Sequence, residues 1–375
     1  MGSALDFMQT NYEAMLRDLK TLVESESPST DKGLLDRTAT LVGSLLDGIG
    51  LDVTIIPDAV GGNHVRGYLA GDDSLKPILI LAHYDTVWNA GTLAEIPFSV
   101  KDGIVRGPGV FDMKAGLIQA LWAIRAAREI IGVRRPIVFL SNSDEEIGSV
   151  FSRPLIEEEA GAAACALVFE ASHHGALKTA RKGTCIYDLH ITGRASHAGL
   201  DPSAGISAIE ELADQIVVLR SIADPSQGTT LNVGIVHGGT RSNVVAAEAH
   251  ASIDIRVASA KEAERVVEAM GRLSARREGI GLSIEGGLNR PPMERTPAVV
   301  ELFRHAQEVG QRLGITLDEA SVGGASDGNF CAAKGVPVID GLGAVGDGAH
   351  AAQEHVIAAT IPIRAALAAE LLAEI

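Results

Sequence analysis

The spacing of apolar residues changes along the chain, and each kind of spacing predicts a kind of element. Residues 8–24 carry apolar side chains at helical intervals, which predicts an amphipathic helix, and residues 33–48 predict a second one. Residues 77–82, with the sequence Pro-Ile-Leu-Ile-Leu-Ala, form a short continuous apolar run instead. Such a run is typical of a strand that helices cover on both faces of a sheet.

Strands and helices continue to alternate up to about residue 170. Residues 114–131 and 150–160 predict helices, while residues 137–141 and 164–169 predict two further buried strands. This alternation indicates a sheet that lies between two layers of helices.

The pattern changes near Arg181. Longer strands with partly alternating side chains are expected at 184–193, 229–237 and 244–257, and helices at 203–221 and 260–277. Beyond Pro292 the first pattern returns, with helices expected at 297–313, 327–334 and 354–374 and a strand at 336–340.

These patterns predict an α/β fold with an inserted α+β domain. The main domain has a mixed, mostly parallel sheet between helices; its first part is residues 1–183 and its second part is residues 292–375. Residues 184–291 form the insert. A chain of 375 residues is long enough for two such domains.

Composition excludes several classes of function. The net charge of −16 leaves no basic surface for nucleic acid. The first residues lack the apolar core of a secretion signal, and no run of about 18 apolar residues could cross a membrane. The three cysteines are far apart, so no disulfide framework is expected. We therefore expect a cytoplasmic protein with no membrane or nucleic-acid partner.

Polar segments that contain His and carboxylate residues lie at the ends of predicted strands or at the start of a helix. They are residues 82–86, 107–114, 142–148 and 169–170. Ligands of open α/β sheets bind at the carboxyl ends of the strands. His and carboxylate side chains that meet at this edge favour a metal site with nitrogen and oxygen ligands.

The order of these motifs resembles one family. H-x-D, G-x-x-D-M-K, D-E-E-x-G and a late His are similar to the dinuclear zinc peptidases related to aminoacylase, acetylornithine deacetylase, carnosinase and glutamate carboxypeptidase. The strings at 82–87, 107–109, 144–149 and 195–198 resemble the bacterial glutamate carboxypeptidase branch most. The resemblance covers nearly the whole chain.

The resemblance implies two divalent metal ions, zinc first, with cobalt and manganese as alternatives. His83 and Glu170 would bind one metal, Glu146 and His350 would bind the other, and Asp112 would bridge both.

Two further acidic residues would support the reaction. Asp85 would accept a hydrogen bond from the other nitrogen of His83 and fix its tautomer. Glu145 would be the general base that takes a proton from a metal-bridging water and passes it to the leaving amine. The peptide bond between Asp112 and Met113 is expected to be cis.

The resemblance places the substrate-binding residues in the insert, which would be the dimerisation and lid domain of a homodimer. Arg256 would grip the free carboxylate of the substrate, with Arg290 as a second carboxylate-side residue, and Asn243 would contact the substrate. His197 would reach the site of the neighbouring subunit and polarise the scissile carbonyl. The Gly-rich residues 323–328 would line the pocket.

Structural interpretations compete with these roles. Asp112 could cap the helix that follows it, His197 could fold a turn, and Arg256 could be an ordinary ion-pair partner. Asp347 and His355 are rivals of His350 for the late ligand. Five other histidines are interpreted as loop, structural or surface residues: His173, His174, His237, His250 and His305.

Together these observations predict a metallo-carboxypeptidase or amidohydrolase. It would release a C-terminal amino acid, glutamate in first place, from a small peptide or an N-acyl amino acid. The alternative is an N-acyl amino acid deacylase or dipeptidase, because the family does not decide which amide is cut. A homologue that binds without catalysis is a third hypothesis, and the presence of all five ligands and the base speaks against it.

Overall fold

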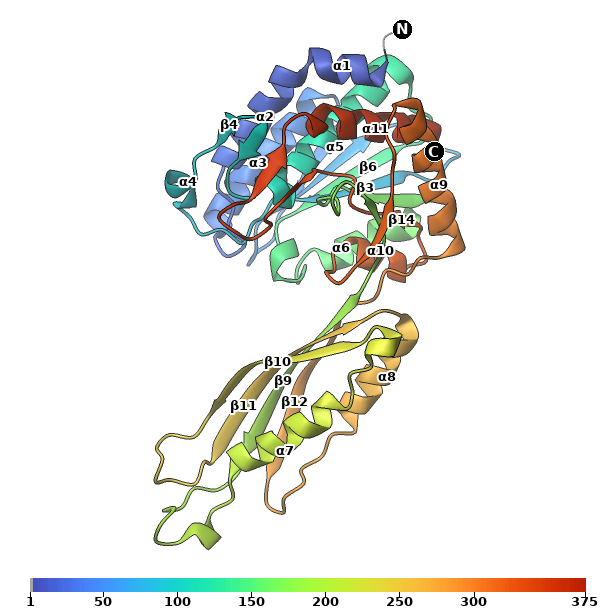
Figure 1. Cartoon of the computed structure of the whole chain (residues 1–375). Coiled ribbons are helices and arrows are strands. Elements are labelled where there is room, and N and C mark those ends of the chain that lie inside the picture. The colour runs from blue at the N-terminus through green and yellow to red at the C-terminus, as the bar shows by residue number, and fades with distance from the viewer. Residues whose placement is uncertain (1–2) are drawn as a thin grey trace. The chain divides into compact units, whose positions relative to one another are not determined.

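The structure is a computed structural model that describes residues 3–375. The chain divides into two compact units (Figure 1). The first unit contains the described residues up to Ala180, Arg295–Val322 and Ser326–Ile375, and the second contains Arg181–Glu294 with Gly323–Ala325. Segments from both ends of the sequence therefore build the first unit.

A six-stranded sheet forms the centre of the first unit. Its strands in spatial order are β1 (Asp52–Ile56), β2 (His64–Leu69), β6 (Ile137–Asn142), β3 (Ile78–His83), β7 (Cys165–Val168) and β14 (Val338–Ile339). The pairs β6–β3, β3–β7 and β7–β14 are parallel, and β1–β2 and β2–β6 are antiparallel. The mixed, mostly parallel sheet that the sequence predicts is confirmed.

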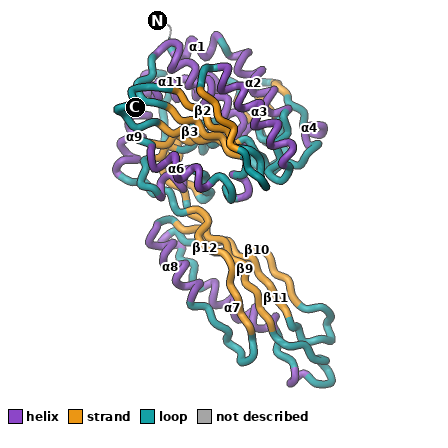
Figure 2. Tube along the Cα trace, turned by 180° about the vertical axis from the view of Figure 1, so that it is seen from behind, coloured by secondary structure: helices purple, strands orange, loops and turns teal. Residues whose placement is uncertain are grey.

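Helices cover both faces of this sheet (Figure 2). They are α1 (Ala4–Thr10), α2 (Tyr12–Glu24), α3 (Lys32–Gly48), α5 (Ala115–Ala126), α6 (Arg153–Ala162), α9 (Pro297–Arg312), α10 (Gly328–Ala333) and α11 (Thr360–Glu374). The short helix α4 (Thr92–Glu95) has no buried residue and lies at the edge of the unit (Figure 1). Every residue of β3, β6 and β7 is buried beneath the helices that cover the sheet. This burial explains why these strands are continuous apolar runs.

The first and the last predicted helices of the first unit differ from the structure. The opening helix is divided at Asn11, whose side-chain amide donates to the Phe7 carbonyl and so ends α1. The last helix starts at Thr360 rather than at residue 354, because His355–Ile357 forms strand β16 instead. This strand pairs with β5 (Ile104–Arg106), which places residues 346–357 beside the segment that carries Asp112.

Two small sheets in the first unit were not predicted. One contains β15 (Gly346–Asp347), β16, β5 and β4 (Ser99–Lys101) in that order, and the other pairs β8 (Leu177–Arg181) with β13 (Glu319–Val322). Their strands have two to five residues, too few for a recognisable alternation of apolar and polar side chains.

The second unit is a four-stranded antiparallel sheet with two helices on one face (Figure 2). The strands in spatial order are β10 (Thr230–Gly238), β11 (Glu248–Val257), β9 (Gly183–Thr192) and β12 (Gly281–Arg290), and the helices are α7 (Ala208–Arg220) and α8 (Ala260–Gly271). Alternate residues of β9 and β11, such as Leu189 and Ile253, pack with Leu212 and Val266 of the helices. This α+β architecture agrees with the predicted one.

No helix among residues 3–375 combines the length and the apolar character needed to cross a membrane.

Candidate metal centre

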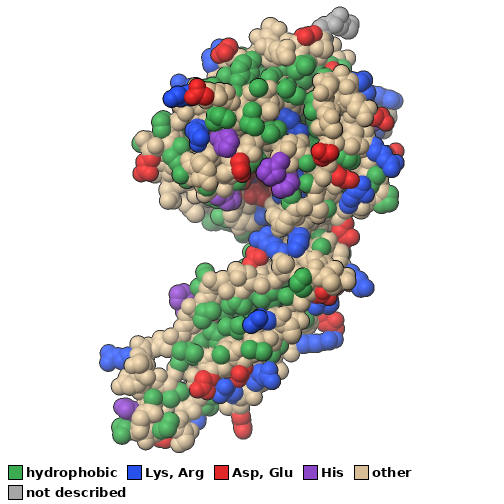
Figure 3. All heavy atoms as spheres, viewed as in Figure 1, with side chains coloured by type: hydrophobic (Ala, Val, Ile, Leu, Met, Phe, Trp, Pro, Cys, Tyr) green, Lys and Arg blue, Asp and Glu red, His purple; other side chains and the backbone are tan. Residues whose placement is uncertain are grey.

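Five side chains from distant parts of the sequence meet beside the carboxyl ends of the central strands. His83 is the last residue of β3, Glu170 follows β7 and Glu146 follows β6, as expected for a parallel sheet. Asp112 comes from the turn before α5, and His350 from the turn between β15 and β16. His and acidic side chains gather on this face of the first unit in Figure 3.

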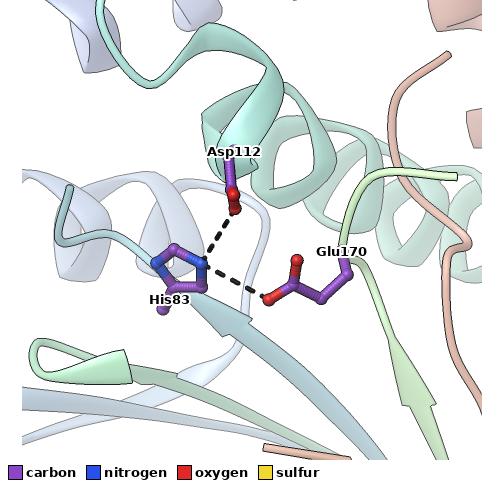
Figure 4. A group of neighbouring side chains, drawn as sticks. All are labelled: His83, Asp112 and Glu170. Carbon is purple, nitrogen blue, oxygen red and sulfur yellow. Dashed lines mark ion pairs between the residues drawn. The ribbon is translucent and has the colours of Figure 1, made fainter. Parts of the chain in front are cut away.

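His83, Asp112 and Glu170 form the first group (Figure 4). The Nε2 atom of His83 lies 3.3 Å from Oδ1 of Asp112 and 3.4 Å from Oε1 of Glu170. One atom from each residue lies within 4.8 Å of the others, so a single cation could contact all three.

Asp112, Glu146 and His350 form the second group. The Nε2 atom of His350 lies 3.3 Å from Oδ2 of Asp112 and 3.1 Å from Oε2 of Glu146. Asp112 thus turns one carboxylate oxygen toward each group, the arrangement that a bridging ligand requires. The rivals Asp347 and His355 belong to neither group of the described chain.

Asp85 organises the residues around both groups. It is fully buried, and the Nδ1 atom of His83 lies 3.0 Å from its carbonyl oxygen and 3.3 Å from Oδ1. Both neighbours are acceptors, so Nδ1 carries the proton and Nε2 keeps its lone pair for a metal. The two carboxylate oxygens of Asp85 also accept from the backbone N–H groups of Glu145 and Glu146, each at 3.2 Å.

Two buried atoms of the cluster fit a cation. Nε2 of His83 and Oε1 of Glu146 make no hydrogen bond with any part of the chain that the structure describes. Buried polar atoms without partners are rare in folded proteins. Metal ions at the two groups would supply the missing partners, and nitrogen with carboxylate oxygen is a donor set that zinc, cobalt and manganese accept.

The pKa values describe the same cluster without metal. Hydrogen bonds to Asp112 and Glu146 raise the pKa of His350 to about 10. Burial is the main cause that raises the pKa of Glu146 to about 7. Burial also opposes ionisation of Asp112, but the nearby imidazole rings of His350 and His83 outweigh it and hold its pKa below the usual range. The metal-free cluster therefore retains protons that a cation would displace.

Glu145 lies next to the cluster without joining either group of the described residues. It starts the short 3₁₀ turn Glu145–Ile147 directly after β6 and is 8% exposed. Asp144, which the sequence did not single out, accepts from the backbone of Phe151 and Ser152 at 2.7 and 3.1 Å and so anchors this turn. The motif alone does not show whether Asp144 binds backbone N–H groups or is an exposed acidic residue.

The Gly-rich segment 323–328 supports the same turn from the other side. Asn142, at the end of β6, donates to Oδ2 of Asp327 at 2.8 Å, and the Ser149 hydroxyl donates to Oδ1. Asp327 is 4% exposed. This part of the segment thus holds the Asp144–Glu146 turn in place.

Glu354 is the other residue that the sequence missed. The helix predicted at 354–374 begins at this residue, but Glu354 lies before the observed helix and is only 2% exposed. Its carboxylate accepts from the loop that carries Asp112. The peptide bond between Asp112 and Met113 is cis, as the resemblance implied.

His197 and Asn243 lie in the second unit on adjoining loops. Ala198 donates its N–H to the Asn243 carbonyl at 3.0 Å, and His197 bridges to Val244. Nδ1 of His197 accepts from the N–H groups of Gly199 and Leu200, both at 3.1 Å, so this residue does fold its turn. The same contacts place the proton of the neutral ring on Nε2, which has no partner among residues 3–375 and can donate outward.

Arg256 and Arg290 lie on either side of Thr184 in the sheet of the second unit. Arg256 donates to both oxygens of Asp254 at 2.7 and 2.8 Å and to the Thr184 hydroxyl at 2.9 Å. It is therefore the ion-pair partner that the sequence offered as an alternative. Three of its five N–H groups donate to these partners, and the other two have no partner among residues 3–375.

The sequence profile of peptidase family M20/M25/M40 matches residues 79–374, which include all five cluster residues. The chain belongs to this family. Membership in this family shows that the protein is a hydrolytic enzyme, and it confirms the predicted resemblance.

Individual relatives agree with this assignment. The M20/M25/M40 peptidase is 31% identical to carboxypeptidase G2 from a Pseudomonas species, over 96% of this chain and 89% of that protein. It is 27% identical to acetylornithine deacetylase from Salmonella arizonae, over 63% of this chain and 66% of that protein. The crystal structure of aminopeptidase PepT from Bacillus cereus has the same fold, with a TM-score of 0.81 at 23% identity over 97% of this chain and 98% of that chain.

Proposed function

We propose that this protein is a dinuclear metal-dependent amide hydrolase that releases a C-terminal amino acid from a peptide or an N-acyl conjugate. The observation that carries the proposal is the pair of three-residue groups that share Asp112. The separate oxygens of this carboxylate face His83 and His350, so two cations would share one ligand.

The residues divide the chemistry between them. Two divalent cations, when bound, lower the pKa of water and polarise a carbonyl oxygen. Glu145 accepts the proton of the attacking water and returns it to the leaving amine. Asp85 supports this step because it fixes the ring of His83 and the backbone of Glu145 together. Nε2 of His197 is the donor for the carbonyl oxygen.

Recognition of a free carboxylate is assigned to the arginine pair of the second unit. Arg256 and Arg290 flank the same threonine, and Arg256 still has N–H groups to offer. Planar guanidinium groups bind carboxylates in bidentate fashion. A substrate with two carboxylates, such as an N-acyl glutamate, matches a pair of arginines better than a substrate with one.

A homodimer is the proposed assembly. β10 is an edge strand of the second unit, and its Ile235 and Val236 are 51% and 50% exposed. Ile209 and Val217 of the neighbouring helix α7 are 46% and 67% exposed. A long apolar edge strand is a template for pairing with another strand, and a second copy of this chain offers the same surface. The cytoplasmic location stays a prediction from the sequence.

The test combines metal analysis with a substrate panel. We expect two divalent ions per chain, complete loss of activity after chelation, and recovery with zinc, cobalt or manganese. The panel should compare N-acyl glutamates, other N-acyl amino acids and dipeptides, and glutamate release should be the fastest reaction. Hydrolysis that survives chelation, or no hydrolysis with metals restored, would contradict the proposal. Faster cleavage of acetylated amino acids or of dipeptides would favour the deacylase or dipeptidase alternative.

A further inference from the structure

Glu354 makes an unusual set of contacts for a residue outside the cluster. Oε1 accepts from the backbone N–H groups of Phe111 and Asp112 at 2.8 and 3.1 Å. Oε2 accepts from the N–H of Gly109 at 3.0 Å and from the indole N–H of Trp88 at 2.8 Å. Three of the four donors belong to the short loop that presents Asp112.

Only an ionised carboxylate satisfies this arrangement. Its two oxygens offer about four acceptor positions, which is the number of N–H groups that converge here. A glutamine of the same shape has one acceptor oxygen and would turn an NH₂ group toward two of the donors. Glu354 is 2% exposed, so the mismatch would be buried and could not be repaired by water.

The loop can adopt this conformation because Gly109 has no side chain. Gly109 has a φ of +70°, and a Cβ atom there would lie 2.4 Å from Cγ2 of Thr86. The N–H groups of Gly109, Phe111 and Asp112 therefore point at one carboxylate, as backbone N–H groups do in a small anion site.

The position of Glu354 in the chain connects the loop to the other end of the cluster. His350 and Glu354 belong to the same hairpin, in which β15 pairs with β16 and the Glu354 N–H donates to the Ala351 carbonyl at 2.8 Å. β16 also pairs with β5, which directly precedes the loop of Asp112. One short segment thus supplies a cluster residue and holds the backbone of another.

We propose that Glu354 is a positioning residue that sets the spacing between the bridging carboxylate Asp112 and His350. It acts through the loop backbone and touches neither metal nor substrate. The inference rests on the proposed function, since it assumes that Asp112 and His350 bind metal.

The test compares Glu354→Gln and Glu354→Asp with the wild type in the cobalt-substituted, full-length protein. Substitution of a residue that hydrogen-bonds a metal ligand typically weakens metal affinity by about 10- to 100-fold. We expect Glu354→Gln to weaken cobalt binding by about this factor, measured by competition with a chromophoric chelator, and to change the visible absorption of bound cobalt. The Glu354→Asp variant keeps the charge and should show smaller changes of the same kind. In both, kcat should fall more than KM rises.

Glu211→Gln is the matched control. Glu211 is fully buried in the second unit and accepts from the backbone N–H groups of Arg276 and Arg277 at 2.9 and 3.1 Å. Its substitution should lower the melting temperature without altering the cobalt spectrum or affinity. A loss of stability that both Glu354→Gln and Glu211→Gln show is thereby distinguished from an effect on the metal centre.

Each outcome decides a different question. If the wild type binds no cobalt, the proposed function fails. If the wild type binds cobalt and folded Glu354→Gln has the same affinity and spectrum, the inference about Glu354 is wrong. It is equally wrong if neither Glu354 variant folds with metal present, because Glu354 would then be needed for the fold alone.

Discussion

At the scale of single residues, the contacts of neighbouring carboxylates distinguish them. Glu145 and Glu146 are adjacent, and Asp85 holds the backbone N–H of each with a different oxygen. Glu146 lies 3.1 Å from Nε2 of His350, whereas Glu145 belongs to neither metal group of the described chain. Under the proposed function, the order Asp-Glu-Glu therefore supplies an anchor, a base and a ligand in succession.

Substitution of Glu145 tests this division. In Glu145→Ala both metals should stay bound, because no ligand is removed. We expect kcat to fall by about 10²- to 10⁴-fold, the usual contribution of a general base. Metal content by plasma emission spectrometry and steady-state kinetics check the two halves of the prediction. A near-normal rate would refute the base assignment, and loss of metal would make Glu145 a ligand.

Metal affinity should rise with pH. In the metal-free protein the pKa of His350 is raised to about 10 and that of Glu146 to about 7. Both groups favour their protonated forms below these values, so protons compete with the cation. Competition titrations at pH 6 and pH 8 should give a clearly weaker apparent affinity at pH 6. An affinity that does not change between these values would mean that the two groups do not bind the metal.

At the scale of elements, close backbone contacts place the ligands. Gly116 of α5 lies so near β7 that a Cβ atom would be 1.9 Å from the Phe169 carbonyl oxygen. Gly343 approaches the same carbonyl, with an added Cβ at 2.2 Å. These two glycines enclose the backbone that presents Glu170, which fixes this candidate ligand relative to α5.

A methyl group at Gly116 should therefore disturb the fold and the first metal group together. We expect Gly116→Ala to lower the free energy of unfolding by about 1–3 kcal/mol, the usual cost of overpacking, and to weaken metal binding. Gly161→Ala in α6 is the control, because a Cβ atom there meets nothing within 4 Å. It should leave stability equal or higher, since alanine favours helices. Equal denaturation midpoints for the two variants would contradict the prediction.

The sequence located the elements that have a strong pattern and missed those that depend on partners. Continuous apolar runs indicated β3, β6 and β7. β12 was missed because Gly281, Gly286 and Gly287 interrupt its alternation, and its extended form comes from pairing with β9.

The candidate site follows the same rule. The order of motifs indicated the five side chains that converge, because each motif has a recognisable local string. Glu354 could not be found in this way. Three of its four donors are backbone N–H groups more than 240 positions away, and such donors leave no trace in the local sequence.

At the scale of the whole molecule, two units share the proposed work. The first unit holds the candidate metal ligands, and the second holds His197, Asn243, Arg256 and Arg290. The apolar edge strand β10 also belongs to the second unit. In a homodimer each subunit could therefore lend residues to the site of its partner.

Mixing two inactive variants tests whether His197 acts across the dimer. His197→Ala and Glu145→Ala homodimers should both be nearly inactive. After the variants are mixed and exchange subunits, a hybrid dimer regains one complete site, so about one site in four becomes active. No recovery, despite subunit exchange shown by native mass spectrometry, would place His197 in the site of its own subunit.

A charge on the proposed dimer surface serves as the control. Val217→Glu places a carboxylate on the exposed face of α7 and should give a monomer by light scattering. Added to both variants, it should abolish the recovery.

The division of the first unit between the two ends of the sequence has a consequence for biosynthesis. Asp112 leaves the ribosome early, whereas His350 and Glu354 follow only after the entire second unit. During translation the earlier residues can gather His83, Asp112 and Glu170, but the second trio is still incomplete. If the cluster binds two ions as proposed, a growing chain can acquire the first ion before the second, and it becomes a competent hydrolase only after its final hairpin has been synthesised and has docked.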